Sequence, residues 1–367
     1  MADLIRVGIV GATVTPGGSG WGANAHVPAL HALPDYALAA VCTAHEDTAK
    51  ASAAQFGAAL AFHDIDAMAA HPDVDLVAVS VRVPLHHQLV MAALRAGKDV
   101  FCEWPLGATL AEAEEMATLA RERGLRTAVG LQARSDPSIR YAHDLVSQGY
   151  LGEVLTANLS VITGAVLERG PGRSWQRERV NGANPLTIAG GHAIDALCFI
   201  LGEITDVSAR VTTRITEWRD ADTGAALPVD APDSIAVAGR FASGAEVAIQ
   251  VASVPVQPSG TRLEIYGREG ALFLTAGSAN IGPNRLLGAR SGETLAEMAP
   301  PDEYLLVPEG TPSGPPRNVA QGYARLADAF RAGDPFDPDF DVAVTRHRLL
   351  EAIERSSESG SALAVSG

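Results

Sequence analysis

The sequence predicts an α/β fold in two parts: a doubly wound parallel sheet at the N-terminus and a C-terminal α+β domain built on a large mixed or antiparallel sheet. In the first third, short β-branched runs alternate with helical patterns at the spacing of βαβ units. From about Gly152, longer segments alternate apolar and polar residues, as in sheets with one polar face. Because 367 residues exceed one ordinary core, we expect domains at residues 1–131 and 132–367. Whether the last helix packs back on the first domain is left open.

The N-terminal elements follow one another closely. The run RVGIVGA at residues 6–12 is β-branched and ends in glycine, which is typical of a buried parallel strand. Further strands are predicted at residues 36–43, 74–81, 98–104 and 126–132. Helices are predicted from about Ala23 and at residues 46–57, 86–97 and 109–124.

The C-terminal part has a different sequence pattern. The turns SGAE and REGA are typical of hairpins, and a segment rich in Gly and Pro, residues 277–316, is expected to form loops. Long strands are predicted at residues 153–164, 203–216, 233–256 and 261–275. Amphipathic helices are predicted at residues 318–333 and 342–359.

A glycine-rich loop follows the first strand. Its residues 18–23, GSGWGA, fit the pattern GxGxxA, and the pattern fits again from residue 20. Such a loop lets backbone N–H groups approach a pyrophosphate at a helix N-terminus. By itself the pattern suits a flexible surface loop equally well, but the βαβ context favours a dinucleotide. The residues expected to hold its phosphates are Gly11, Gly18, Gly20, Trp21 and Gly22.

The end of the second strand bears on the choice of cofactor. Dinucleotide sites specific for NAD usually carry an Asp or Glu there, which binds the adenosine ribose. This chain has Thr43, Ala44 and His45 instead. The missing acid removes repulsion against a 2′-phosphate, and Thr43 or His45 could hydrogen-bond that group. We therefore expect NADP or NAD, with a slight preference for NADP.

Composition excludes several classes of function. The net charge of −15 argues against a nucleic-acid surface. We expect no membrane span, because no uninterrupted apolar run of about 18 residues is present. The three cysteines are scattered, no secretory signal is visible and no metal-binding motif is found. These features predict a cytoplasmic protein without a metal.

Three stretches resemble one known family. They are GWGANAHVPAL, LHHQLVMAALRAGKDVFCEWPL and LTIAGGHAIDAL. In this order, and over nearly the whole chain, they resemble the Gfo/Idh/MocA oxidoreductases. The resemblance implies an N-terminal Rossmann domain and NAD(P)-dependent oxidation of a sugar, polyol or related small molecule. It also implies a homodimer or homotetramer, formed through the open face of the C-terminal sheet.

Two of the family's polar catalytic positions are changed in this chain. The usual Glu-Lys-Pro triplet at the end of a strand reads Glu103, Trp104 and Pro105 here, so the lysine is absent. The Asp that normally stands four residues before the motif histidine is replaced by Ile188. The Trp, together with SQGYLG and GHAID, resembles the subgroup that contains the yeast galactose-pathway corepressor, a regulator.

The resemblance also implies a set of site residues. His192 is expected to face the nicotinamide and to exchange the proton of the reaction. Asp195, three residues further on, either orients that imidazole or contacts the first domain. The other residues expected beside the cofactor or the cleft are Val81, His86 and Gln132.

Trp104 and Glu103 are expected to shape the catalytic site. Trp104 could stack on a sugar or on the nicotinamide, or it could only pack, but it cannot take a proton. An aromatic residue before proline also raises the chance of a cis peptide at Trp104–Pro105.

Arginines form a further pattern. Arg82 ends a strand, and Arg169, Arg173 and Arg177 stand with Trp175 in the loop ERGPGRSWQRERV. A basic loop in an acidic protein suggests an anionic or heavily oxygenated ligand. Arg82 could reach a phosphate or an anionic substrate. The plainer interpretations are a surface ion pair at Arg82 and a solvated loop at residues 168–180.

The favoured function is therefore an NAD(P)-dependent oxidoreductase that transfers hydride to or from a sugar, polyol or similar carbonyl compound, with His192 as proton donor or acceptor. The first alternative is a dinucleotide-binding transcriptional regulator or sensor without turnover. The second is a lyase or hydrolase assisted by bound NAD.

Overall fold

The computed structural model describes residues 4–15 and 20–365 and divides the chain into two compact units. The first unit comprises Met1–Gly130, Gly170–Trp175 and Leu306–Val344. The second comprises the remaining segments. The division differs from the expected one, because residues 306–344 return to the first unit instead of staying with the second.

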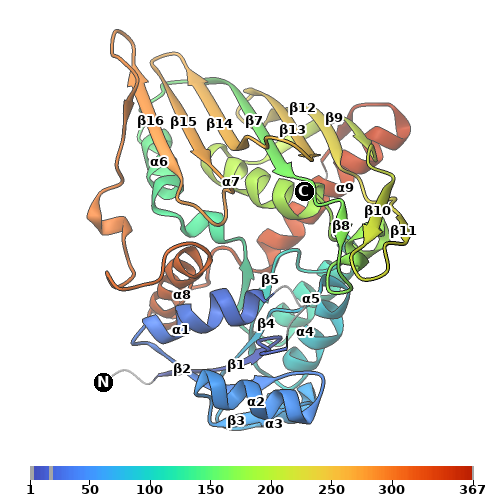
Figure 1. The fold of residues 1–367 in the computed structure, drawn as a ribbon. Coiled ribbons are helices and arrows are strands. Elements are labelled where there is room, and N and C mark those ends of the chain that lie inside the picture. The colour runs from blue at the N-terminus through green and yellow to red at the C-terminus, as the bar shows by residue number, and fades with distance from the viewer. Residues whose placement is uncertain (1–3, 16–19, 366–367) are drawn as a thin grey trace. The chain divides into compact units, whose positions relative to one another are not determined.

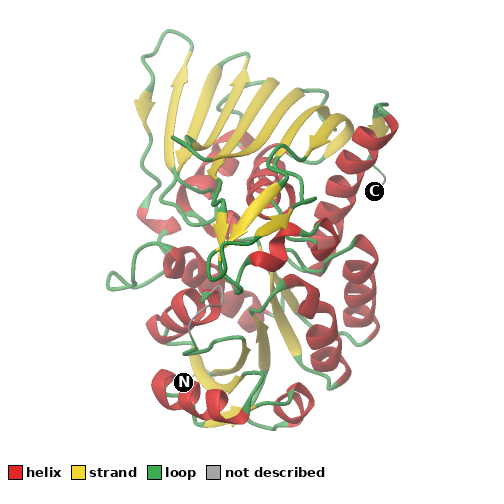
Figure 2. Ribbon diagram, turned by 45° about the vertical axis from the view of Figure 1, so that its right-hand side comes forward, coloured by secondary structure: helices red, strands yellow, loops and turns green. Residues whose placement is uncertain are grey.

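The first unit contains a parallel sheet of six strands in the order β3-β2-β1-β4-β5-β6, which is the order of a Rossmann fold. Helices flank this sheet (Figures 1 and 2). The strands are β1 (Ile5–Val10), β2 (Tyr36–Cys42), β3 (Leu60–Phe62), β4 (Leu76–Val79), β5 (Asp99–Glu103) and β6 (Thr127–Gly130). The helices are α1 (Val27–Ala32), α2 (Glu46–Phe56), α3 (Ile65–Ala70), α4 (His86–Arg95), α5 (Leu110–Glu122) and α8 (Pro315–Ala332).

The second unit contains a mixed sheet of nine strands in the order β17-β16-β15-β14-β7-β13-β12-β9-β18. Only β7 and β13 pair in parallel; the other neighbours are antiparallel. The central strands are β7 (Val154–Gly164), β9 (Ile204–Thr212), β12 (Ser234–Phe241), β13 (Glu246–Val254), β14 (Gly260–Gly267) and β15 (Gly270–Ala276). The edge strands are β16 (Arg285–Arg290), β17 (Ala296–Glu297) and β18 (Leu363–Ala364).

Three helices and a small sheet complete the second unit. The helices are α6 (Pro137–Ser147), α7 (Gly191–Leu201) and most of α9 (Phe340–Ser359). The small sheet joins β8 (Glu168–Arg169), β10 (Glu217–Asp220) and β11 (Ala226–Pro228). The fold class predicted from the sequence is thus confirmed. The expectation of loops throughout residues 277–316 was wrong, because β16 and β17 extend the sheet there.

Along β12 and β13 the side chains alternate between buried and exposed, as the sequence pattern predicted. Residues 179–201 are long and apolar enough by composition to cross a membrane. Most of this stretch is buried inside the protein, however, and it contains Arg179 and Asp195. These features fit a core helix.

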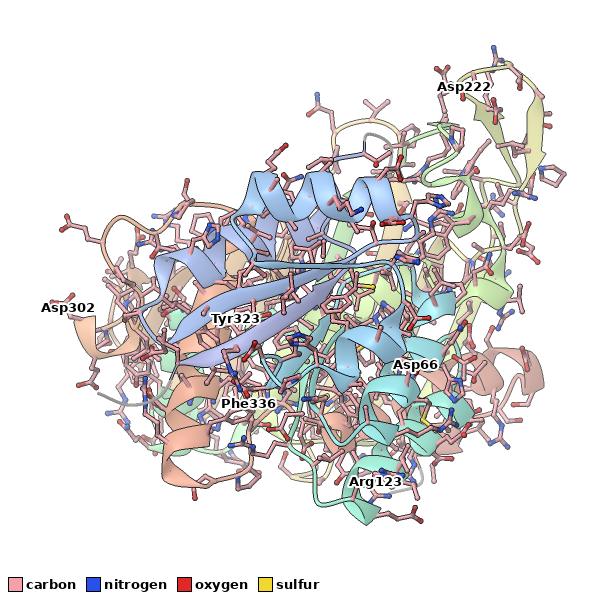
Figure 3. The ribbon with its side chains drawn as sticks, turned by 90° about the horizontal axis from the view of Figure 1, so that it is seen from below. Asp66, Arg123, Asp222, Asp302, Tyr323 and Phe336 are labelled. Atoms are coloured by element: carbon pink, nitrogen blue, oxygen red, sulfur yellow. The ribbon has the colours of Figure 1, made fainter. Side chains whose placement is uncertain are left out.

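Helix α8 completes the core of the first unit. Tyr323 of α8 is fully buried in the same apolar cluster as residues of β1, α1 and β2 (Figures 1 and 3). Tyr36 donates a hydrogen bond to the Tyr323 carbonyl oxygen (2.7 Å). The Tyr323 hydroxyl lies 2.9 Å from Nδ1 of His26. Burial raises the pKa of Tyr323 well above its usual range, so the hydroxyl stays neutral.

We expect Tyr323→Phe to destabilise the first unit by about 1–3 kcal/mol, because the buried His26 ring loses a hydrogen-bond partner. Thermal unfolding measures this effect. The control is Tyr266→Phe, whose hydroxyl is only partly buried and lies 3.3 Å from Glu264. An equal change in both variants would contradict the assignment.

Candidate nucleotide and substrate site

At the carboxyl edge of the parallel sheet, the backbone after β1 lies very close to the backbone after β4. Gly11, directly after β1, has φ +99°, and a Cβ there would lie 2.1 Å from the Ser80 carbonyl oxygen. A Cβ on Gly22 would lie 2.9 Å from the backbone nitrogen of Ala12. Only glycine fits at Gly11, and a side chain at Gly22 would force the loop to shift. At Gly11 and at Gly22 the backbone therefore comes close to its neighbours, as a phosphate-binding segment requires.

The loop passes directly into a helical segment. A π-helical turn at Gly22–His26 continues into α1, close to the predicted start at Ala23. Trp21, which precedes the turn, packs partly buried against the core. Gly20 accepts a hydrogen bond from the backbone of Asn24 (2.7 Å). Gly18, the remaining predicted phosphate contact, lies outside the described residues.

The end of β2 shows which polar group is open to a ligand. The Thr43 hydroxyl is used locally: it donates to the carbonyl oxygen of His45 (3.0 Å) and lies 2.7 Å from the Thr48 hydroxyl. His45 stands before α2 with an exposed side chain. Of the two predicted residues, His45 is therefore the more accessible to a cofactor.

His86 lies between the segments that follow β4 and β5. It is fully buried, with Nδ1 2.9 Å from the Pro105 carbonyl oxygen and Nε2 3.2 Å from that of Val81. Burial lowers the pKa of His86, so the ring is neutral near pH 7 and donates from one nitrogen only. His86 thus lies between the segment after β4 and the turn after β5 and can donate a hydrogen bond to only one of the two carbonyl oxygens at a time, a structural contact that the sequence did not reveal.

That turn contains the unusual triplet. The Trp104–Pro105 peptide is cis, in agreement with the aromatic–proline pair. Trp104 is only 5% exposed, which favours a packing contribution over an open platform. Glu103 is also buried, and its Oε1 lies 2.8 Å from Nε2 of His26. Since His26 in turn contacts Tyr323, the carboxylate is fixed by residues that sequence reasoning had not singled out.

Ser80 is a further residue that the sequence analysis missed. It follows β4, is 4% exposed, and its hydroxyl has no hydrogen-bond partner within the described part of the chain. An unsatisfied buried hydroxyl costs about 1–3 kcal/mol. A ligand acceptor at this strand end, beside Gly11, would remove that cost. The strand ends of the first unit therefore fit a dinucleotide.

In the second unit, Asp195 is held by two arginines. Its carboxylate accepts two hydrogen bonds of 2.8 Å from Arg134 and one of 3.3 Å from Arg346. Arg346 also binds Glu203 at 2.9 Å. Burial alone would raise the pKa of Asp195, but the two guanidinium groups outweigh it and lower that pKa. Asp195 is thus a buried anchor for three segments.

This anchor also positions two predicted site residues. Arg134 belongs to the 3₁₀ turn Gln132–Ser135, and Asp195 lies on α7 three residues after His192. Both Gln132 and His192 are buried, 4% exposed each. The Arg134–Asp195 pair therefore fastens the turn that carries Gln132 to the helix that carries His192.

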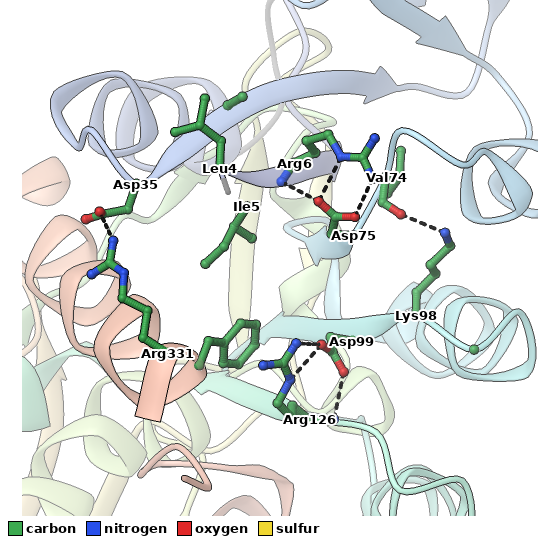
Figure 4. A pocket seen from close by; sticks show the side chains of 13 residues that line it. Leu4, Ile5, Arg6, Asp35, Val74, Asp75, Lys98, Asp99, Arg126 and Arg331 are labelled. Atoms are coloured by element: carbon green, nitrogen blue, oxygen red, sulfur yellow. Dashed lines mark hydrogen bonds and ion pairs between the residues drawn. The ribbon is translucent and has the colours of Figure 1, made fainter. Parts of the chain in front are cut away.

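A cavity of about 1160 Å³ opens at the opposite, amino edge of the parallel sheet (Figure 4). Most of its basic side chains have carboxylate partners: Arg6 binds Asp75 (2.7 Å) and Arg126 binds Asp99 (2.6 Å). Lys98 donates to backbone carbonyl oxygens. Because these groups are satisfied within the protein, and open α/β sheets bind ligands at the carboxyl edge, we do not assign the site here.

We expect Asp195→Asn to destabilise the protein by about 3–5 kcal/mol, because two buried guanidinium groups lose their shared counter-charge. Since the folded pKa of Asp195 lies below its ordinary 3.8, the stabilisation is complete above that value and is lost as pH falls through the folded pKa. Thermal unfolding between pH 2 and 7 measures both effects. The control Asp222→Asn, at an exposed turn (Figure 3), should change little.

Comparison with known proteins agrees with this geometry. Residues 5–131 match the family model "Oxidoreductase family, NAD-binding Rossmann fold", and residues 137–276 match "Gal80p, C-terminal domain". Dehydrogenase aclE of Aspergillus oryzae is 32% identical over 98% of both chains. Levoglucosan dehydrogenase of Pseudarthrobacter phenanthrenivorans is 25% identical over 70% of this chain and 71% of that protein.

The regulatory protein GAL80 of Saccharomyces cerevisiae is 28% identical over 66% of this chain and 59% of its own length. A crystal structure of a Gal80p super-repressor mutant matches with a TM-score of 0.88 and 25% identity, over 99% of this chain and 98% of that one. Taken together, the matched models, the parallel sheet and the full-length similarity show that the chain belongs to the Gfo/Idh/MocA family of NAD-binding oxidoreductases, with a Gal80p-like C-terminal domain.

Proposed function

We propose that the protein is an NAD(P)-dependent oxidoreductase that interconverts a hydroxyl and a carbonyl group on a sugar, polyol or similar compound. The observation that carries this proposal is the set of strand ends around Gly11 and Ser80. There the backbone of Gly11 lies close to the Ser80 carbonyl oxygen, and the buried Ser80 hydroxyl lacks a partner in the described chain. The dehydrogenases among its relatives, which include one for levoglucosan, support the sugar-like substrate.

A bound nicotinamide would accept or supply the hydride. His192 would exchange the proton of the substrate hydroxyl, since an imidazole titrates near neutral pH. The residues at the family's other two polar positions, Trp104 and Ile188, cannot exchange protons. Because a positioned acid–base group typically contributes about 10²–10⁴ in rate, we expect slow turnover. Glu103, held by His26, would shape the pocket floor.

A second candidate is a dinucleotide-binding regulator without turnover. The specific observation in its favour is the match of residues 137–276 to the Gal80p C-terminal domain, together with Trp104 in place of the catalytic lysine. The regulator would bind the cofactor tightly and leave its C4 hydrogen unexchanged. The two candidates therefore differ in one measurable property.

The first test follows this hydrogen. Purified protein is mixed with NADH or NADPH deuterated on either face of C4, with a trace of the oxidised cofactor and with a panel of sugars and polyols, and loss of label is measured by mass spectrometry. We expect slow label loss with the wild type and at least about a 10²-fold decrease in His192→Ala.

The matched control is His31→Ala, an exposed histidine of the first unit. Because His192 is buried, NADH affinity and melting temperature are compared in parallel to detect misfolding, and His192→Gln provides a less disruptive variant. Cofactor binding without label loss, for every compound, would favour the regulator. Undiminished exchange in a folded His192 variant would refute the proton assignment.

The second test concerns the cofactor. We propose a slight preference for NADP, supported by the exposed His45 and by the lack of an acid after β2. Ala44→Asp introduces a carboxylate at this strand end. We expect it to weaken NADPH binding by about tenfold or more through repulsion of the 2′-phosphate, while NADH affinity stays equal or improves. Titration calorimetry measures both. Equal weakening of both cofactors would contradict the assignment.

A further inference from the structure

The arginines of the loop at residues 168–179 are not equivalent. Arg177 pairs with the neighbouring Glu178 (2.6 Å), and Arg179 pairs with Glu354 (3.1 Å). Arg169 stacks on the ring of Trp218, 4.5 Å from its centroid. These three arginines are engaged by other residues of the second unit, so they are not available as the main charge for an anionic ligand.

Arg173 and Arg82 differ from them. Both side chains are exposed, and in the described part of the chain neither has a carboxylate partner. Both belong to the first unit, because the segment Gly170–Trp175 is part of it. The guanidinium carbon of Arg82 lies 6.0 Å from the ring centroid of Trp175. In a chain of net charge −15, Arg82 is thus an exposed cation beside an aromatic ring.

The segment that brings Trp175 to Arg82 is held by its own backbone. The amides of Arg173 and Ser174 both donate to the Gly170 carbonyl oxygen (3.0 Å each). The indole N–H of Trp175 donates to the Gly172 carbonyl oxygen (3.0 Å). The ring is therefore fixed, and its face is a defined support for a guanidinium group.

Arg82 stands at the carboxyl edge of the parallel sheet. It lies two residues after Ser80, whose carbonyl oxygen meets Gly11, and it follows Val81, which lies beside the same His86 ring as Pro105. This places the residue beside the ends of β1, β4 and β5, the region where open α/β sheets bind ligands. The 2′-phosphate of a cofactor would lie elsewhere, at the end of β2.

We propose that Arg82, supported by Trp175 and assisted by Arg173, binds an anionic oxygen group of the substrate; this inference rests on the proposed oxidoreductase function. The guanidinium group offers parallel N–H donors that match a carboxylate or a phosphate. The substrate class is accordingly a sugar acid or a sugar phosphate and not a neutral sugar.

The test compares matched compounds: a set of aldoses, the corresponding uronic and aldonic acids, and the corresponding 6-phosphates. Two quantities are measured for each: kcat/KM with NAD⁺ or NADP⁺, and the dissociation constant from the NADH-loaded protein by calorimetry. We expect anionic members to bind about 10- to 100-fold more tightly than their neutral counterparts, as for a charge-assisted hydrogen bond. The acid and phosphate arms distinguish the two sources of charge.

Arg82→Gln should abolish this preference by raising KM for the anionic compound, with kcat and NADH affinity nearly unchanged. Arg173→Gln should reduce the preference less. The control is Arg95→Gln, an exposed arginine in the last turn of α4, with no carboxylate partner in the described chain. A wild type that binds neutral and anionic compounds equally, or binds none, would overturn the proposal. So would an Arg82→Gln variant that loses kcat on neutral and anionic compounds alike, which would indicate a cation at the reacting oxygen.

Binding and turnover separate this proposal from the preceding one. If anionic compounds bind with the expected preference but no compound is oxidised or reduced, the anion site stands and the oxidoreductase function fails. If neutral sugars are turned over without any preference for charge, the oxidoreductase function stands and the anion site fails.

Discussion

The buried carboxylate of Asp195 joins three segments of the second unit through ion pairs with two buried arginines. Arg134 and Arg346 approach it from segments that are 61 and 151 residues away in the sequence. A carboxylate without these partners could not remain ionised in such a place. The first unit contains a comparable chain of hydrogen bonds, in which Glu103 contacts His26 and His26 contacts Tyr323. In each unit, a buried acid fixes residues adjacent to the proposed chemistry.

In the two motifs singled out from the sequence, the residues that support the structure differ from those proposed to take part in chemistry. In GGHAIDAL, the histidine is the residue that we propose exchanges a proton, and the aspartate anchors the helix to Arg134 and Arg346. In the Glu-Trp-Pro triplet, the glutamate is held by the protein and the tryptophan is packed inside it. Trp104 therefore fills the position of the family's lysine as a buried residue. Retained architecture with altered chemistry is compatible with a slow or specialised enzyme and with a regulator.

Sequence reasoning identified five of the six strands in the first unit's parallel sheet, because their apolar runs are short and several are β-branched or bounded by glycine. It missed β3, which is only three residues long. It also predicted β12 and β13, because apolar and polar residues alternate along them. It missed β16, because the neighbouring sequence is rich in Gly and Pro. It placed α8 in the second domain, because an amphipathic pattern shows that one helix face is buried but not which part of the protein that face contacts. The roles of Asp195 and His86 were also missed. Their partners lie far along the chain or are backbone carbonyl groups, which no residue pattern reveals.

The return of residues 306–344 to the first unit has a consequence for how the protein is made. A ribosome releases the six parallel strands long before it reaches α8, yet Tyr323 and its neighbours fill the same apolar cluster as β1 and α1. Until that helix emerges, the early sheet exposes an apolar face and His26 lacks one of its partners. The first unit therefore completes its folding only near the end of translation, after most of the second unit has been synthesised. Removing residues 306–367 would leave a nucleotide-binding domain whose apolar cluster is exposed on the side that α8 covers.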